Sequence, residues 1–271
     1  MNNGLLQMFW MPLGLFMRHR VLTWEMTKRE VRDRYADQML GSLWALGHPI
    51  LLVTVYVIVF KYVFRVGALS EAGQDYTVFL LSGMLPWLTF QDSLNKTTSS
   101  LVANARLVKQ IVFPIEILPA KAVFSSFVNQ LIGSVLLVGY VLVTTRTLSP
   151  AYALLPFLWL MQWLAMLGFG FLLSAIGAYF RDLSNMVLMF GTVGIYTMPI
   201  CYTPELVPSS LRFLLYLNPF SYMIWCYQDI CYHGELAHPW AWCVFPGGAV
   251  LLFYFGFYSF QRLKVYFGSI L

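Results

Sequence analysis

The segment NARLVKQIVFPIEILPAK, residues 104–121, separates two long apolar runs and decides how the rest of the chain is arranged. It is too short and too charged to cross a lipid bilayer, so it must lie on one side of the membrane. That side is predicted to be the cytoplasm, because loops that stay inside concentrate lysine and arginine. The basic residues of the segment are Arg106, Lys109 and Lys121.

Helical spacing within this segment predicts an amphipathic helix over residues 104–118. Leu107, Ile111 and Ile115 would share one face of that helix. The residues near another face are polar or basic: Arg106, Lys109 and Gln110. Such a helix can cover the membrane surface or press against a soluble partner, and the segment alone favours neither.

The composition identifies the solvent of most of the chain as lipid. Of its 271 residues, 59% are hydrophobic and only 11% are charged, whereas soluble domains carry about 25% charged residues. No charged side chain occurs between Lys121 and Arg146, or between Arg146 and Arg181. Both intervals exceed the roughly 20 apolar residues that cross a hydrocarbon core. The sequence therefore predicts an all-α, polytopic integral membrane protein.

The apolar runs predict six transmembrane helices in a single transmembrane domain, residues 1–271. The predicted spans are residues 43–64, 76–99, 122–143, 153–178, 186–201 and 240–260. Six spans place both termini on the same side, and the basic residues put that side in the cytoplasm. Most of the 17 lysines and arginines then lie in the cytoplasm. The exceptions, which would lie outside, are Lys61, Arg65, Arg146 and Arg212.

Two further segments are helical without spanning. Residues 18–37 predict an amphipathic helix lying in the membrane interface, with Trp24 and Tyr35 at headgroup level, although a solvated cytoplasmic helix is the alternative. Residues 203–232 are rich in proline yet still apolar. They predict short re-entrant helices that dip into the outer leaflet before the last span, where protein or a watery cavity can line them.

The inner half of the second predicted span is polar. Asp92 and Lys96 lie four residues apart with the acid first, which is the favourable order for a helical ion pair. So polar a half-helix must face other helices or water and not acyl chains. A packed ion pair is preferred over direct contact with a transported molecule.

Several kinds of chemistry lack their sequence signatures. The chain has no GxxxxGK[ST] phosphate loop, no HExxH and no GxSxG, so no catalytic residue is predicted and no ATP is expected to bind in that manner. His233, Glu235 and His238 lie close together but are interpreted as polar loop residues, and no metal site is predicted. The four cysteines lack CxxC spacing and are expected to be buried apolar residues. A transporter built this way needs energy from another chain.

Six short motifs in chain order resemble the membrane subunits of type-2 ABC exporters, most closely the branch that exports O-antigen, capsule and teichoic acid chains. The resemblance covers about residues 20–265. The motifs are RYADQMLGSLWALGHP (34–49), LPW (85–87), FPIEILP (113–119), YFRD (179–182), MPICY (198–202) and LNPF (217–220). One departure is Gln228, near a position where relatives commonly carry arginine.

The resemblance implies a partner. Arg106–Ile115 would be a coupling helix docked in a groove of a separate ATPase subunit, present in two copies, which binds ATP and Mg. The turn Tyr179–Asp182 and the helix Val21–Tyr35 would touch the same subunit. Phe113 and Ile111 would be buried anchors and Glu116 a charged contact. The candidate ATPase-coupling residues are Arg106, Lys109, Gln110, Ile111, Phe113, Glu116, Arg181, Asp182, Glu25 and Arg29.

The resemblance also implies a homodimer whose pore is lined largely by the first and fifth spans of each copy. A stripe that recurs every four residues along the first span consists of Trp44, His48, Leu52, Tyr56 and Phe60. Sugars present apolar C–H faces that can stack on its aromatic rings. Ordinary interfacial aromatic belts are the alternative. The candidate channel-lining residues are Trp44, His48, Tyr56, Phe60, Trp87, Phe190 and Tyr196. The candidate outer-gate residues are Pro204, Pro208, Pro219 and Phe220.

The expected function is export of a lipid-linked polysaccharide, with O-antigen first among cargoes, across the bacterial inner membrane. The expected partners are the ATPase, a second copy of this chain, the polysaccharide and membrane lipids, and no nucleic acid. A capsule or teichoic acid polymer, a drug or a lipid is the alternative cargo. A membrane-embedded transferase built around Asp92, Asn95 and Lys96 is the rival from another class, but no DxD or HxxxxD constellation supports it.

Overall fold

The computed structural model of the chain describes residues 11–12, 14–34, 43–59, 75–109 and 113–270. Throughout these residues the regular structure is helical, and none of them forms a β-strand. This agrees with the all-α class that the apolar runs predict.

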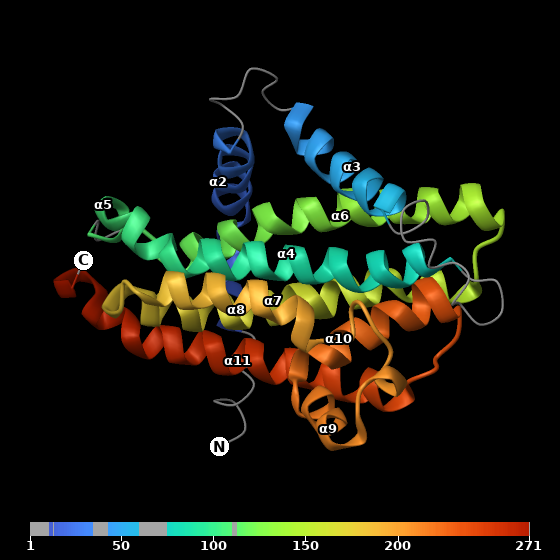
Figure 1. Cartoon of the computed structure of the whole chain (residues 1–271). Helices are drawn as coiled ribbons and strands as arrows, with labels where there is room; N and C mark the ends of the chain where they lie inside the picture. The colour runs from blue at the N-terminus through green and yellow to red at the C-terminus, as the bar shows by residue number, and fades with distance from the viewer. Residues whose placement is uncertain (1–10, 13, 35–42, 60–74, 110–112, 271) are drawn as a thin grey trace.

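Four long helices lie alongside one another and form the body of the protein (Figure 1). They are α4 (Tyr76–Ala103), α6 (Ile117–Thr145), α7 (Leu155–Tyr179) and α11 (Pro239–Ile270). Helix α4 packs against α6 and α7, and α11 packs along α7. The shorter α8 (Leu183–Thr197) lies mainly against α4. Large buried aromatic side chains, among them Trp87, Phe171 and Phe257, fill the centre.

Three helical stretches of the described chain are long and apolar enough to cross a membrane: Ile117–Thr145, Pro150–Tyr179 and Pro239–Gly268. The second of these consists of the 3-10 helix η5 (Pro150–Leu154) followed by α7. Two shorter apolar stretches are Gly47–Val57 and Leu183–Thr197. Helix α4 is equally long, but its second half carries the polar run from Gln91 to Thr98. The architecture is therefore that of a multi-pass membrane protein.

Close approach between these helices depends on glycine. A Cβ atom built on Gly256 of α11 would overlap the backbone of Gly168 in α7, and one built on Gly168 would lie 2.6 Å from the carbonyl oxygen of Leu252. Gly177 of α7 meets the backbone of Thr98 in α4 in the same way. Small residues at helix crossings let backbones approach closely, which is how helices associate in membranes.

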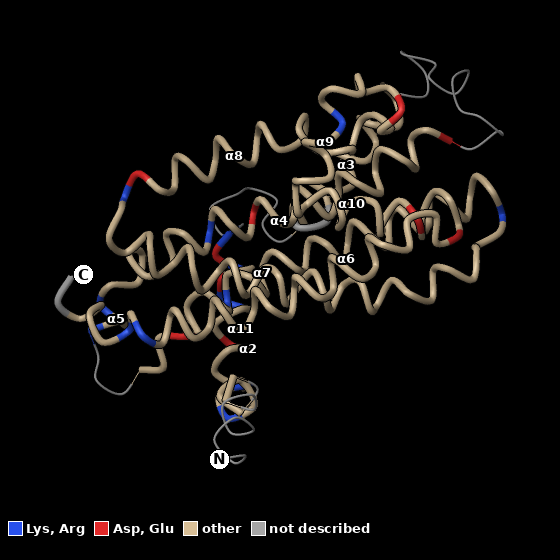
Figure 2. The backbone as a smooth tube through the Cα atoms, turned by 90° about the horizontal axis from the view of Figure 1, so that it is seen from below, with Lys and Arg blue, Asp and Glu red and all other residues tan. Residues whose placement is uncertain are grey.

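Two helices lie on the α6 side of the body. Helix α2 (Arg20–Asp33) runs across the direction of the long helices, seen from the side in Figure 1 and nearly end-on in Figure 2. Its buried residues are Thr23 and Thr27, whereas Trp24 is exposed. Helix α3 (Trp44–Val57) packs against α6 and α4. The crosswise course of α2 suits a helix lying on a membrane surface, and Tyr35 falls outside the described residues.

The proline-rich stretch forms short helices between α8 and α11. They are η6 (Pro204–Leu206), α9 (Ser209–Leu217), α10 (Pro219–Gln228) and η7 (Asp229–His233). Helix α10 begins at Pro219, because proline suits the first helical position, where its missing N–H is not needed. The side chain of Asn218 caps the helix by accepting a hydrogen bond from the Phe220 amide. Helix α10 is buried against α4 and α11, whereas most of α9 is exposed. Neither is long enough to cross a bilayer.

The predicted helix over residues 104–118 is not continuous. Helix α5 covers only Ala105–Val108, Phe113 and Pro114 are not helical, and α6 begins at Ile117. Residues 110–112, including Gln110 and Ile111, lie outside the described residues. Pro114 explains the break, because proline lacks an N–H and disfavours helical geometry in the residue before it. The expected single apolar face through Leu107, Ile111 and Ile115 is therefore wrong.

Candidate functional site at the α5 end of the bundle

One end of the bundle gathers exposed charge. At this end, here called the α5 end, lie α5, the start of α6, the turn between α7 and α8, and the last turns of α11 (Figure 1). Figure 2 shows lysine and arginine concentrated there. The exposed charged residues of this end are Arg106, Lys109, Arg181, Asp182 and Arg262. The structure thus brings the two predicted partner-contacting turns, from separate parts of the chain, to one end of the molecule.

Glu116 was predicted to contact a partner protein, but the structure places it inside this chain. Its side chain is buried, with 1% of the residue exposed. Its Oε1 atom lies 2.7 Å from Lys264 Nζ and accepts a hydrogen bond of 2.7 Å from Gln261 Nε2. Glu116 therefore ties the start of α6 to the end of α11 within this chain. Phe113 is half-buried and packs against the apolar core of its own chain, so only part of it is available to another protein.

The predicted contact residues on α2 are exposed, and their ion pairs within the described part of the chain are with near neighbours on that helix. Glu25 pairs with Lys28 at 2.7 Å, and Arg29 with Asp33 at 3.3 Å. Exposed ion pairs of this kind contribute little to stability, so they leave these side chains available to a partner.

Two other ion pairs join α2 to the body. Glu30 Oε2 lies 2.8 Å from Lys121 Nζ on α6, and Arg34 Nη2 lies 3.3 Å from Asp92 Oδ1 on α4. Lys121 lies in the second turn of α6, the helix that follows α5 in the chain. The two ion pairs therefore connect α2 to α6, which begins at the α5 end, and to α4, which ends there. The sequence pattern did not reveal these pairs, because each joins residues far apart in the chain.

Asp92 is the centre of a polar cluster inside the bundle. The predicted ion pair with Lys96 is present at 2.8 Å, and the hydroxyl of Ser126 on α6 donates a hydrogen bond of 2.8 Å to Asp92 Oδ2. With Arg34, these contacts hold α2, α4 and α6 together. A pocket of 380 Å³ adjoins the cluster. Its lining comes from the end of α2 and from α3, α4 and α6, and most of the lining residues are polar or charged. They are Arg34, His48, Pro49, Leu52, Leu85, Leu88, Thr89, Gln91, Asp92, Asn95 and Asn129.

The candidate channel residues divide into two groups. On α3, His48 is exposed and Trp44 and Tyr56 are half-buried; on α8, Phe190 and Tyr196 are exposed by 43% and 73%. Phe60 lies outside the described residues.

Trp87 does not belong with the exposed group. It is fully buried, and its Nε1 donates a hydrogen bond of 3.1 Å to the carbonyl of Gly191 on α8. Its ring meets Phe90, Phe190 and Phe220. The prediction that Trp87 lines a channel is therefore wrong for this chain, and its role is to join α4, α8 and α10.

The candidate gate residues shape the short helices. Pro204 is half-buried and begins η6. Pro208 is exposed and directly precedes α9, and Pro219 is exposed and begins α10. Phe220 is half-buried in the aromatic cluster around Trp87. Gln228 donates a hydrogen bond of 2.7 Å to the Pro199 carbonyl and so links α10 to the residues that follow α8.

Gln162 is a structural residue that the sequence reasoning missed. Its Nε2 donates a hydrogen bond of 3.0 Å to the carbonyl of Pro86 in α4, and its Oε1 accepts one from the Tyr227 hydroxyl. A lone amide in an apolar run was the available signal, because a buried polar group in a membrane helix must find a partner.

This arrangement defines a class: a multi-pass helical membrane protein that carries exposed charged residues at one end of its helix bundle. The chain belongs to the ABC-2 type transporter family, which residues 21–232 match. Membership of this family supports a transporter and not an enzyme.

Individual relatives narrow the branch to polysaccharide export. The chain is 29% identical over 246 residues to the O-antigen export system permease protein RfbA of Klebsiella pneumoniae, covering 90% of this chain and 93% of that protein. It is 27% identical to RfbA of Myxococcus xanthus, covering 81% and 83% of the two chains. It is 22% identical to the polysialic acid transport protein KpsM of Escherichia coli, covering 73% and 72%. The resemblance inferred from the short motifs is confirmed.

Proposed function

We propose that this chain is the membrane-spanning half of an ATP-driven exporter that moves a lipid-linked polysaccharide, O-antigen in the first instance, across the bacterial inner membrane. The observation that carries the proposal is its similarity to O-antigen export permeases along 90% of its length. The similarity to a polysialic acid transport protein supports a second polysaccharide cargo as the alternative.

In the proposed topology, six helices span the membrane and both termini are cytoplasmic. The spans are α3, α4, α6, α7 with η5, α8 and α11. The exposed basic residues of the α5 end support this orientation, because basic residues concentrate inside. Among the described residues, the lysines and arginines of the opposite end are Arg146 and Arg212. Helices α9 and α10 would form the re-entrant outer gate, since they are too short to cross.

The proposed partner is an ATPase, two copies of which would bind ATP and Mg²⁺ and dock at the α5 end. Arg106, Lys109, Arg181 and Asp182 are exposed there and suit that contact. Glu25 and Arg29 of α2 would touch the same partner. Closure of the ATPase would then reach the spans through the ion pairs that tie α2, α6 and α11 to the bundle.

Two copies of this chain would enclose the pore. Helices α3 and α8 carry large hydrophobic side chains that remain exposed in one chain, and both helices are predicted to line the export path. Tyr56, Phe190 and Tyr196 present rings on which the apolar faces of sugars can stack.

Deleting the gene in its own host is expected to abolish surface polysaccharide and leave the lipid-linked polymer inside the cell. Polysaccharide extracted from intact cells and from lysed cells would be compared after treatment with an enzyme that degrades only exposed polymer. Expression of the wild-type chain from a plasmid is the control and should restore the surface polymer. Unchanged surface polysaccharide in the deletion strain would contradict the proposed cargo.

A further inference from the structure

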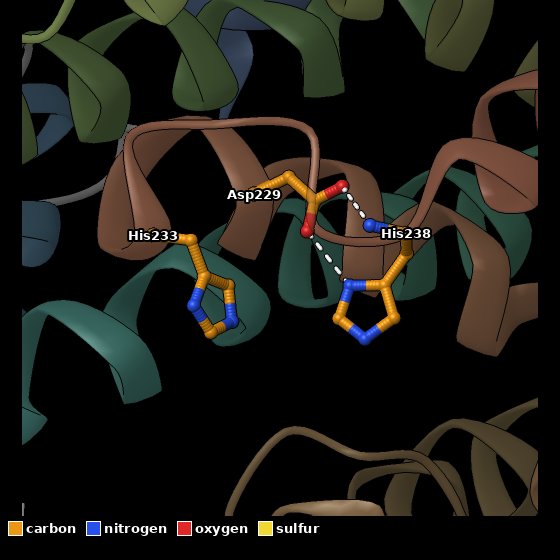
Figure 3. Close-up of side chains that lie close together, drawn as sticks. All are labelled: Asp229, His233 and His238. Atoms are coloured by element: carbon orange, nitrogen blue, oxygen red, sulfur yellow. Dashed lines mark hydrogen bonds and ion pairs between the residues drawn. The ribbon is translucent and has the colours of Figure 1, made fainter. Parts of the chain in front are cut away.

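A carboxylate and two imidazoles converge at the end of the bundle opposite α5 (Figure 3). Asp229 and His233 begin and end η7, and His238 directly precedes α11. Gly234, in the left-handed region with φ 72°, turns the chain back between them. Potential ligand atoms of the three side chains all lie within 4.8 Å of one another. The sequence places Glu235 close to the two histidines, but in the structure Glu235 is exposed and the carboxylate beside the histidines is that of Asp229.

The Asp229 carboxylate is fully buried, with 0% of the residue exposed, and makes no ion pair with a lysine or arginine of the described chain. Its Oδ2 accepts hydrogen bonds of 3.0 Å from the His238 amide and from Trp242 Nε1. These two donors fix the carboxylate and direct Oδ1 to His238 Nδ1, 2.7 Å away. A buried carboxylate needs a compensating positive charge, which a proton on His238 or a bound cation can supply.

His233 distinguishes these two possibilities. A hydrogen-bonded pair of Asp229 and His238 needs no third residue. Figure 3 nevertheless shows the His233 ring next to the Asp229 carboxylate, and both imidazole rings lie below that carboxylate in the view. The two ring centroids are 5.9 Å apart. Neighbouring rings hold the imidazoles in place: Trp225 stacks on His238 and Tyr232 meets His233 edge-on. Fixed orientation of imidazole ligands by surrounding groups is a property of metal sites.

We propose that Asp229, His233 and His238 bind one divalent transition metal ion of the zinc class. Two imidazoles and one carboxylate are a donor set that zinc accepts, with a fourth position left for water or another oxygen. The ion would take Asp229 Oδ1 and one nitrogen of each ring, while Oδ2 keeps its two N–H donors. His238 would bind through Nδ1, so the proton shared between that atom and Asp229 Oδ1 is released to water and the ring keeps its proton on Nε2.

Such an ion would fasten η7, at the end of α10, to the start of α11. These elements meet where the proposed outer gate joins the last span. The metal site itself does not depend on the cargo or on the ATPase partner.

Zinc binding to the full-length chain in detergent tests the proposal. The protein would carry an affinity tag without histidine and the substitution Cys243→Ser, because Cys243 is an exposed thiol that can bind zinc. After removal of metal with a chelator, zinc chloride is added, and bound zinc and the unfolding temperature are measured. We expect one zinc per chain and a raised unfolding temperature.

His233→Gln decides the outcome, because His233 makes no hydrogen bond to Asp229 or His238 that its loss would break. This variant is expected to fold and to lose at least tenfold in zinc affinity. His19→Gln, in the N-terminal helical segment, is the matched control and should bind like the wild type. Absence of bound zinc in the wild type, or equal binding in His233→Gln, would overturn the proposal and leave Asp229 and His238 as a hydrogen-bonded pair.

Discussion

Replacing Gly256 with alanine is expected to lower the stability of the chain, although alanine favours a helix over glycine by about 1 kcal/mol. The added methyl group would overlap the backbone of Gly168 where α11 crosses α7. Neither backbone can give way without separating the two helices. Overpacking of this kind costs roughly 1–3 kcal/mol and sometimes more. After the helical gain is subtracted, we expect a net loss of about 1 kcal/mol, seen as a fall of about 3 °C in the unfolding temperature in detergent.

Gly248→Ala is the matched control. It lies on the same helix, and a Cβ atom there meets nothing within 4 Å. It should leave the unfolding temperature unchanged or raise it. Equal unfolding temperatures for the two variants would contradict the close α7–α11 crossing.

Reversing the charge of Arg106 is expected to block association with the ATPase while leaving the fold intact. Arg106 is exposed on α5, so Arg106→Glu should not change the unfolding temperature. Opposite charges guide a partner to its surface and like charges repel it, at a cost of several kcal/mol when the charges are closely juxtaposed. We expect at least a tenfold loss of copurified ATPase and of surface polysaccharide.

Arg146→Glu is the control for this variant. Arg146 is also exposed but lies at the end of α6, at the opposite end of the bundle. It should retain the complex and export. A normal complex with Arg106→Glu, or equal losses from both variants, would contradict docking at the α5 end.

The sequence predicted the helices whose signals are local. Asp75 accepts a hydrogen bond from the Thr77 amide and starts α4, where the second apolar run was predicted to begin. Prolines at 204 and 219 begin the short helices in the stretch where the spanning pattern was interrupted. The exposure of Arg106, Lys109, Arg181 and Asp182 also followed from charge in short turns between apolar runs.

Residues whose roles depend on distant partners could not be predicted in this way. Glu116 follows a basic segment and was taken for a surface contact, but its partner Lys264 lies 148 residues further on. Trp87 was taken for a channel residue because aromatic rings suit sugars. Its burial depends on Gly191 and Gly194 of α8, where a Cβ atom would displace Gln91 or the indole itself. The spacing of residues along α4 alone cannot predict where α8 packs against it.

Affinity purification of this chain from its own host in mild detergent, with every copurifying protein identified and counted, tests the exporter assignment most directly. We predict a separate ATPase carrying a GxxxxGK[ST] phosphate loop, in two copies for every two copies of this chain. Purification of the chain alone, with no such ATPase under conditions that keep it folded, would contradict it.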